Sequence, residues 1–331
     1  MRADERRVSR MERLLRLRRA EVFDRLSPDD LGLVADQARV RAFRRGEHLH
    51  RSGERILAVH VVVEGRVHLW RAGRDLGYAS PGTGVGGLGF LARDDSGIDA
   101  VAETDVVVLE LDAETLSEVM EDRASILRVL LHEMSRRLID LWHQAPEACQ
   151  AAQTQMAAPG FGRSLLLVER MLFLRTALPF IRSSASALAD LARVLVELSF
   201  EPGTLLWHRG DAARQVLLLV NGRVSCSAPI EGFCLAPPAG FPLGGLEAVA
   251  GALRWYDATC ETPVTVLSGD VEVLFDLFED NPDVGLEYVA QIARVQLRAV
   301  ECLAGTDRDT ILGSLLGAGL RPAPSRLAQL P

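Results

Sequence analysis

The sequence contains no lysine, so all 37 of its basic residues are arginine. Set against 45 acidic residues, they leave a net charge of −8. Binding to the phosphate backbone of nucleic acid needs a basic face, which this composition does not provide in general. We therefore expect no nucleic-acid partner.

Cysteine is scarce and scattered. The five cysteines are odd in number and show no Cys-x-x-Cys spacing, which argues against a disulfide framework and against a structural zinc site. Histidines on alternating positions, His48 with His50 and His60 with His68, could share a strand face. No carboxylate or cysteine pairing gives them a metal-ligand spacing, so we expect no metal and no cofactor.

Long apolar runs are also missing. No segment reaches the roughly 20 residues that a membrane helix needs. The first 20 residues carry eight arginines and no apolar core of signal-peptide length. The sequence also lacks a nucleophile elbow, a P-loop, an HExxH motif and paired catalytic carboxylates at a known spacing. These absences predict a cytoplasmic protein that is not an enzyme and does not span a membrane.

The sequence does contain a long internal repeat. Residues 86–109 recur as 244–267 at a constant offset of 158, and residues 23–67 recur as 180–224 at an offset of 157. An ungapped match across a loop and its flanking segments indicates a duplicated unit. The predicted organisation is a basic N-terminal helix (1–20), a first domain (21–142), a linker and helix (143–176), a second domain (177–303) and a C-terminal tail (304–331).

Local patterns predict the elements within each copy. Ser27 and Pro28 indicate the start of a helix, with serine as the N-cap and proline at the first helical position. Apolar residues alternate along 57–63 as in a strand with one buried face, and Asn221-Gly222 is typical of a hairpin turn. A short helix is expected at 310–316. The N-terminal helix either packs on the domain that follows or contacts a membrane surface or an acidic partner.

The order of helices, short strands, glycine loop, last strands and long helix resembles the cyclic nucleotide-binding domain family, which includes CRP and the regulatory subunit of protein kinase A. The resemblance covers about residues 20–142 and 177–303. It implies an α+β, mainly β fold of two tandem jelly-roll barrels, each flanked by helices. It is carried in the first copy by Phe43-x-x-Gly46, Ser52-Gly-Glu54, Val63-Glu-Gly-Arg-Val67, Pro81-Gly82, Gly86-Gly-Leu88 and Ala102-Glu-Thr-Asp105.

Ligand-binding members of that family carry a cassette similar to Phe-Gly-Glu-Leu-Ala, followed by Arg-x-Ala. The resemblance implies that a helix N-terminus and the arginine hold the cyclic phosphate while the glutamate accepts from the ribose hydroxyl. In the first copy Gly87 takes the glutamate position and Ser96 the arginine position. The first pocket is therefore interpreted as degenerate, and its residues are Gly86, Gly87, Leu88, Ser96 and Asp99.

The second copy keeps half of the cassette. Gly245 takes the glutamate position, but Arg254 falls in the arginine position and is followed by Trp255 and Tyr256. Arg254 could hold a phosphate while an aromatic ring stacks on a base. The alternative, which we favour, is that Arg254 is a solvated loop residue and that the two aromatic residues fill the empty cup. The candidate ligand-binding residues are Gly244, Gly245, Leu246, Arg254, Trp255 and Tyr256.

Two intact fold patterns without their ionic ligand partners favour a regulatory or scaffold protein that acts through protein–protein interaction, either with another protein or as a homodimer. In this hypothesis the first domain has lost cyclic nucleotide binding. The alternative is a cyclic nucleotide sensor that uses the second domain. A transcription factor of the CRP type is disfavoured, because neither 144–177 nor the tail is long or basic enough for a helix-turn-helix domain.

Overall fold

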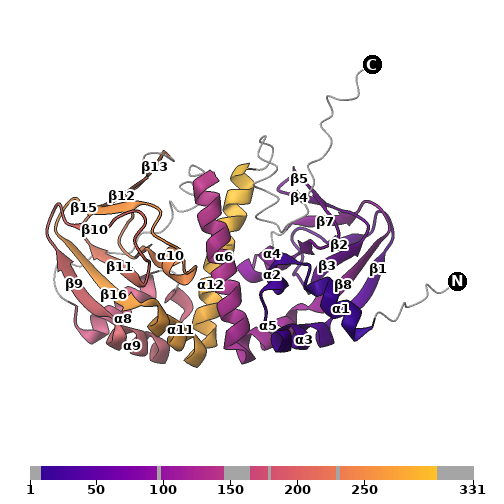
Figure 1. Cartoon of the computed structure of the whole chain (residues 1–331), viewed down its shortest axis with the longest axis horizontal. Coiled ribbons are helices and arrows are strands. Elements are labelled where there is room, and N and C mark those ends of the chain that lie inside the picture. Colours follow the sequence, from indigo (N-terminus) through magenta and orange to yellow (C-terminus); the bar gives the residue numbers. More distant parts are fainter. Residues whose placement is uncertain (1–8, 95–97, 145–164, 178–179, 229–231, 304–331) are drawn as a thin grey trace, which may run out of the picture. The chain divides into compact units, whose positions relative to one another are not determined.

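The computed structural model describes residues 9–94, 98–144, 165–177, 180–228 and 232–303. The chain divides into two compact units, residues 1–129 with 296–331 and residues 130–295 (Figure 1). Ser96 and the helix expected at 310–316 lie outside the described residues. Each unit is described by itself below.

The first unit contains two four-stranded antiparallel sheets. Their strand orders are β1-β8-β3-β6 and β2-β7-β4-β5, so most successive strands change sheet, whereas β4 and β5 pair within one sheet. The strands are β1 (Arg39–Phe43), β2 (His48–His50), β3 (Ala58–Glu64), β4 (Val67–Arg71), β5 (Arg74–Ala79), β6 (Gly84–Val85), β7 (Asp99–Ala102) and β8 (Val106–Asp112).

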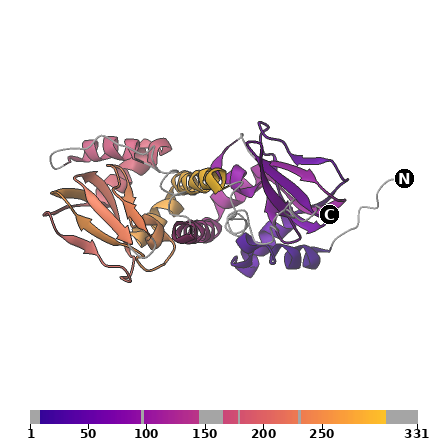
Figure 2. The same ribbon diagram turned by 90° about the horizontal axis from the view of Figure 1, so that it is seen from above.

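The second unit repeats this arrangement strand for strand. Its sheets have the orders β9-β16-β11-β14 and β10-β15-β12-β13, which are the first unit's orders with each strand number raised by eight. The predicted pair of jelly-roll barrels is confirmed, and Figure 2 shows the strands of each unit gathered into one group. The strands are β9 (Val196–Phe200), β10 (Leu205–Trp207), β11 (Gln215–Asn221), β12 (Val224–Ala228), β13 (Phe233–Leu235), β14 (Pro242–Leu243), β15 (Asp257–Cys260) and β16 (Val264–Asp270).

Helices flank both barrels, and several of them begin after a residue whose side chain caps the helix. Ser27 accepts a hydrogen bond from the Asp30 N–H at the start of α3, and Asp112 and Asp270 cap α5 and α11. The helices are α1 (Arg10–Leu17), α2 (Glu21–Asp24), α3 (Pro28–Gln37), α4 (Gly87–Ala92), α5 (Ala113–Asp122), α6 (Ala124–Gln144), α8 (Leu167–Thr176), the 3₁₀ helix η1 (Phe180–Arg182), α9 (Ala185–Val194), α10 (Gly245–Val249), α11 (Val271–Asp280) and α12 (Pro282–Leu303).

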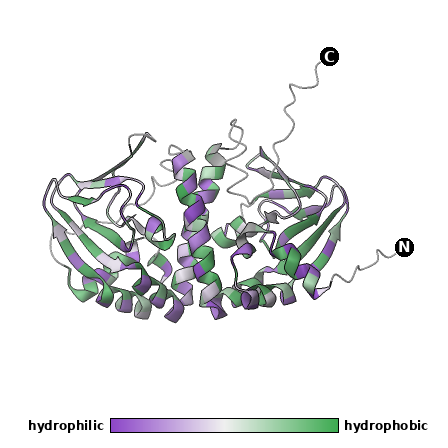
Figure 3. Cartoon of the chain, in the orientation of Figure 1, coloured by the Kyte–Doolittle hydropathy of each residue, from purple (hydrophilic) through white to green (hydrophobic). Residues whose placement is uncertain are grey.

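Strand β3 differs from the sequence prediction, because it has two buried faces where one was expected. Leu57, predicted to start the buried face, is 69% exposed, whereas His60 and Val62 on the opposite face are 2% and 1% exposed. His60 lies toward β2 of the other sheet, and Val59 and Val61 fill the second buried face. The sequence of a strand that is buried on both faces is a nearly continuous run of apolar residues and does not alternate. Figure 3 shows hydrophobic residues dominating the strands of both units.

The N-terminal helix α1 packs against α3, and the Arg10 guanidinium donates to the Asp36 carboxylate at 2.6 Å. Only part of its apolar stripe is buried, however. Leu17 is fully buried, whereas Met11 and Leu15 are 64% and 58% exposed. The helix therefore packs on its domain and still presents an apolar surface.

Candidate functional site

Both glycine loops place their first glycine in the left-handed region, directly before a short helix. Gly86 has φ +88° before α4, and Gly244 has φ +66° before α10. Each glycine also lies against a basic side chain. A Cβ atom on Gly86 would lie 2.5 Å from His50 Nε2, and one on Gly244 would lie 1.9 Å from Arg254 Nη1. Both loops therefore need glycine for backbone conformation and for space.

Arg254 is buried in the second unit and bonded to backbone. Its Nη1 donates to the Gly244 carbonyl at 2.7 Å, and its Nη2 donates to the Gln215 carbonyl at 2.6 Å. The side chain is only 5% exposed. The prediction of a solvated loop arginine is therefore wrong: the guanidinium joins the glycine loop to β11, and its charge stabilises the buried Gly244 carbonyl and the partly buried Gln215 carbonyl.

Two further groups face the Arg254 guanidinium. The Trp207 ring lies under it, with 4.3 Å from Cζ to the ring centroid. A Glu247 carboxylate oxygen lies 4.0 Å from Nη1, beyond hydrogen-bonding distance. Burial lowers the pKa of Arg254, although Glu247 opposes that shift. The Arg254 guanidinium therefore bonds two backbone carbonyls and contacts the face of one aromatic ring, and a carboxylate lies further away.

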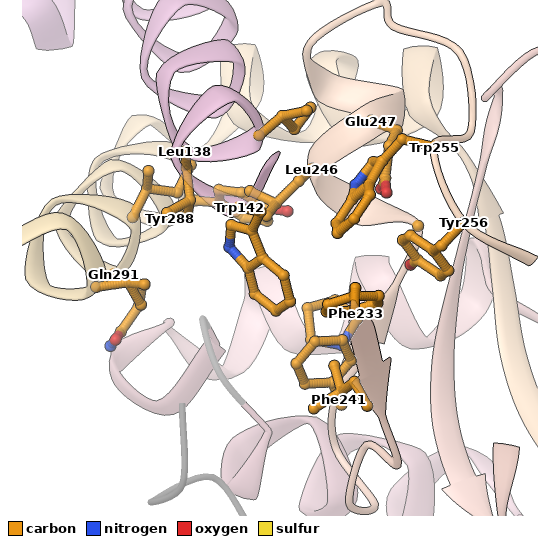
Figure 4. A pocket seen from close by; sticks show the side chains of 16 residues that line it. Leu138, Trp142, Phe233, Phe241, Leu246, Glu247, Trp255, Tyr256, Tyr288 and Gln291 are labelled. Atoms are coloured by element: carbon orange, nitrogen blue, oxygen red, sulfur yellow. The ribbon is translucent and has the colours of Figure 1, made fainter. Parts of the chain in front are cut away.

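A pocket opens beside α10, and all sixteen residues that line it belong to the second unit (Figure 4). Its wall is aromatic and aliphatic, and Trp255 and Tyr256 are 7% and 6% exposed. None of the lining residues is basic, and Glu247 is the one that carries a carboxylate. The lining residues are Leu138, Ile139, Trp142, Phe233, Leu235, Phe241, Pro242, Gly244, Leu246, Glu247, Trp255, Tyr256, Tyr288, Gln291, Ile292 and Val295.

A few polar groups stand among these apolar side chains. Burial raises the pKa of Glu247, although Arg254 and a hydrogen bond from Trp255 oppose the rise. The Trp142 indole is 4% exposed, and its Nε1–H has no hydrogen-bond partner among the described residues. Burial also raises the pKa values of Tyr256 and Tyr288, so both phenols stay neutral. Such a pocket suits a planar ligand with few polar atoms.

The structure brings the candidate residues of the second copy close together, but only four of the six line the pocket. Gly244, Leu246, Trp255 and Tyr256 line the pocket. Gly245 is the first residue of α10, and a Cβ atom there would meet the Tyr288 hydroxyl at 3.1 Å. Arg254 is not among the lining residues.

In the first copy, the candidate residues that the structure describes belong to secondary-structure elements or their hydrogen bonds. The Asp99 carboxylate accepts from the Ser52 N–H at 2.8 Å, and its repeat partner Asp257 accepts from the Arg209 N–H at 2.7 Å. Leu88 lies in α4 after Gly86 and Gly87. Since Ser96 is not described, the arginine position of this copy has no structural account.

The sequence prediction did not name most of the residues that line the pocket, Glu247 and Trp142 among them. Glu247 lies two positions after the glutamate position of the cassette and is 2% exposed. Trp142 lies at the end of a long apolar stripe in α6, where the sequence suggested only packing. A carboxylate inside the apolar segment 243–250 was the available signal for Glu247.

Comparison with protein families decides what the first barrel is. The family model described as the cyclic nucleotide-binding domain matches residues 40–123. The first unit contains a cyclic nucleotide-binding domain. Because the second unit repeats its strand order and its loops, the chain is a tandem pair of cyclic nucleotide-binding folds, and the predicted family is confirmed.

Solved structures with similarity to these tandem cyclic nucleotide-binding folds have low identity. The regulatory domain of Toxoplasma gondii protein kinase A with cAMP is 16% identical, with 85% of this chain and 95% of that chain covered and a TM-score of 0.32. A regulatory subunit of a cAMP-independent protein kinase A from Trypanosoma cruzi, bound to guanosine, is 16% identical, with coverages of 87% and 93% and a TM-score of 0.32. The N-terminal domain of a Streptomyces coelicolor A3(2) transcriptional regulator is 21% identical, with coverages of 40% and 97% and a TM-score of 0.35. No curated protein matches the chain.

None of the described helices is both long and apolar enough to cross a membrane. Within the same residues, no three histidine, cysteine or acidic side chains gather as metal ligands. The histidines that do meet are His50 and His60, from different strands, and not the pairs that their spacing suggested.

Proposed function

We propose that the chain is a non-enzymatic regulatory protein whose second domain binds an uncharged planar ligand in the aromatic pocket. The observation that carries this proposal is that the Arg254 guanidinium points to backbone carbonyls and not into the pocket. Its two terminal nitrogens donate to the carbonyls of Gly244 and Gln215, and it does not line the pocket. A phosphate placed there would lie near the Glu247 carboxylate without a free guanidinium, which disfavours a cyclic nucleotide.

The pocket wall supports recognition by stacking and by a small number of hydrogen bonds. Trp142, Phe233 and Trp255 contact one another, with ring centroids 4.5 to 5.9 Å apart. The unpartnered Trp142 Nε1–H offers a donor, and the Glu247 carboxyl offers an acceptor or, when protonated, a donor. A neutral heteroaromatic ring with donors and acceptors on its edge satisfies these groups.

For the first domain, we propose that cyclic nucleotide binding is lost. Gly87 takes the position of the glutamate that would accept from the ribose. Arg71, a buried arginine of this barrel, is held by the Asp94 carboxylate at 2.8 Å. A ligand phosphate would have to break that ion pair, and the partly buried carboxylate would lose this partner.

Isothermal calorimetry on the full chain tests the ligand class. Adenosine and guanosine are compared with the cyclic monophosphates of the same bases, and we expect the nucleosides to bind more tightly. Trp142→Phe, which keeps a ring but removes the N–H, should weaken binding about tenfold, the value of one hydrogen bond. Tighter binding of the cyclic nucleotides, or silence across all four compounds, would refute the proposal.

Protein interaction is a second candidate function, favoured by apolar side chains exposed at equivalent places in both domains. Met11 and Leu15 on α1 are 64% and 58% exposed, and Val168 and Leu172 on α8 are 65% and 59% exposed. The two pairs are related by the offset of 157 residues. Exposed apolar side chains one helical turn apart suit a partner helix.

This second candidate is tested by sedimentation velocity of the chain alone and with captured proteins from its host. Val168→Ser with Leu172→Ser should abolish the association, while Thr176→Ser on the same helix serves as the control. An association that survives the double substitution, and survives the equivalent change at Met11 and Leu15, would exclude these helices as the contact.

A further inference from the structure

The first barrel contains a chain of hydrogen-bonding side chains that runs from its surface to the glycine loop. The Glu110 carboxylate on β8 lies 3.1 Å from His60 Nε2, and His60 Nδ1 lies 3.0 Å from His50 Nε2. His50 in turn hydrogen-bonds the backbone of Val85, the last residue of β6, directly before the glycine loop. His60 is 2% exposed, so solvent cannot replace a contact that fails.

Counting protons shows that this chain cannot be satisfied by two neutral imidazoles. It has three links: the Val85 carbonyl to His50, His50 to His60, and His60 to Glu110. Each link needs one proton between its two heavy atoms. A neutral imidazole carries one N–H, so two neutral rings supply two protons for three links. Full bonding requires one additional proton on the pair.

The link that lacks a proton in the neutral state can be identified. Burial of Glu110 would raise its pKa, but hydrogen bonds from Arg41 and His60 lower it, and the Arg41 contact is 2.6 Å. The ionised carboxylate takes the His60 Nε2–H, which leaves His60 Nδ1 to accept from the His50 Nε2–H. His50 Nδ1 then carries a lone pair that faces the Val85 carbonyl. In the neutral state the Val85 carbonyl therefore lacks the hydrogen bond from His50, and the glycine loop that follows Val85 is held less firmly.

We propose that the His50–His60 pair is a proton-operated clamp, which takes up one proton from solvent and fixes the glycine loop of the first domain to the barrel. The proton adds the His50 Nδ1–H that donates to the Val85 carbonyl, so all three links are bonded. No other bond forms or breaks. The ring cation is balanced by the Glu110 carboxylate, and this function is independent of ligand binding in the second domain.

The surroundings of the pair set the pH at which the clamp operates. The charged groups that face it are Glu110 from β8 and Arg41 from β1, Phe43 of β1 places its ring edge on His60, and Gly86 presents only backbone. Burial lowers the pKa of His50 to about 4, and it also lowers that of His60. The clamp therefore closes under acidic conditions.

The second domain holds its glycine loop one residue further along the chain, with a permanent charge. His60 pairs across the sheet with Glu110 and Val85, and the equivalent strand position, Leu217, pairs with Ser268 and Leu243. His50 corresponds to Trp207. The histidines are thus replaced, and the loop carbonyl of Gly244 accepts instead from Arg254, whose charge does not titrate. One domain holds its glycine loop with a fixed cation, the other with a titratable one.

NMR on the full chain tests this proposal. The histidine ring nitrogens and the Val85 carbonyl carbon are followed from pH 7.5 downward. We expect the His50 ring and the Val85 carbonyl to shift together with a midpoint near pH 4, while the Gly244 carbonyl stays constant. Glu110→Gln keeps the shape but removes the counter-charge, so the midpoint should fall by about one pH unit. His68, paired with Asp75 outside this chain of contacts, serves as the reference in every sample.

Three results would overturn the clamp. The first is a Val85 carbonyl signal that stays flat while His50 titrates. The second is a Glu110→Gln midpoint equal to that of the unmodified chain. The third is unfolding of the first domain above pH 5 with His50 still neutral. His50→Asn gives an independent check, because an asparagine cannot titrate and the Val85 signal should lose its pH response.

Discussion

The Arg254 guanidinium donates to the carbonyl of Gly244 at 2.7 Å, so the residue that could have neutralised a phosphate is bonded to the loop that would have held it. Its other terminal nitrogen bonds the Gln215 carbonyl. The bond to Gly244 is buried and the bond to Gln215 is partly buried, and the Arg254 side chain is 5% exposed. We therefore expect Arg254 to act mainly on stability, which gives the first prediction.

Arg254→Met should lower the free energy of unfolding of the second domain by about 3 kcal/mol, because one buried and one partly buried carbonyl lose charged hydrogen bonds. Urea denaturation monitored by tryptophan fluorescence measures the change. Arg223→Met is the matched control, since Arg223 is 71% exposed, and it should change stability by less than about 0.5 kcal/mol. Equal effects of the two variants would show that the Arg254 bonds do not stabilise the domain.

Gly244→Ala should be more damaging than an ordinary glycine substitution. The new Cβ would lie 1.9 Å from Arg254 Nη1, in addition to the strain of φ +66°. Gly203→Ala controls for strain alone, because Gly203 has φ +82° and no atom within 4 Å of the added Cβ. We expect about 1 kcal/mol for Gly203→Ala and about 3 kcal/mol for Gly244→Ala, measured by denaturation midpoints.

The pH dependence of stability should reveal Glu247. Burial raises its pKa in the folded state above the unfolded value of 4.5, so the folded state holds the proton more tightly. That contribution is fully present below pH 4.5 and is lost as the pH rises through the folded pKa. Relative to Glu247→Gln, the unmodified chain should therefore become less stable as the pH increases from 4.5 to 8.5.

Thermal or urea midpoints at several pH values give that comparison. Glu261→Gln is the control, because Glu261 is 47% exposed, and its difference from the unmodified chain should stay constant over the same range. If the stability difference between Glu247→Gln and the unmodified chain is also constant with pH, burial does not raise the pKa of Glu247.

Asp99→Ala should destabilise the first domain by about 1 kcal/mol, the value of one hydrogen bond to backbone. Asp257→Ala should do the same in the second domain, since both carboxylates accept from a backbone N–H at equivalent positions. Neither substitution should change ligand affinity measured by calorimetry. A selective loss of binding in Asp257→Ala would instead place that carboxylate in the ligand site.

Local sequence determined the elements and their order. Ser27 before Pro28 and the turn at Asn221-Gly222 act through neighbours in the chain, and each was found where the pattern placed it. The repeat then fixed the two barrels, because the same residues recur at the same spacing. The glycines of the loops were also readable, since positive φ is a local property.

Only the tertiary structure decided what the side chains of the loops do. Whether Arg254 points to solvent, to a ligand or to a carbonyl depends on Gln215, which is 39 residues away. The contact between His50 and His60 joins strands of different sheets, and the pocket joins residues from 138 to 295. Burial and long-range contacts set charge and hydrogen bonding there, and no local pattern in the sequence encodes them.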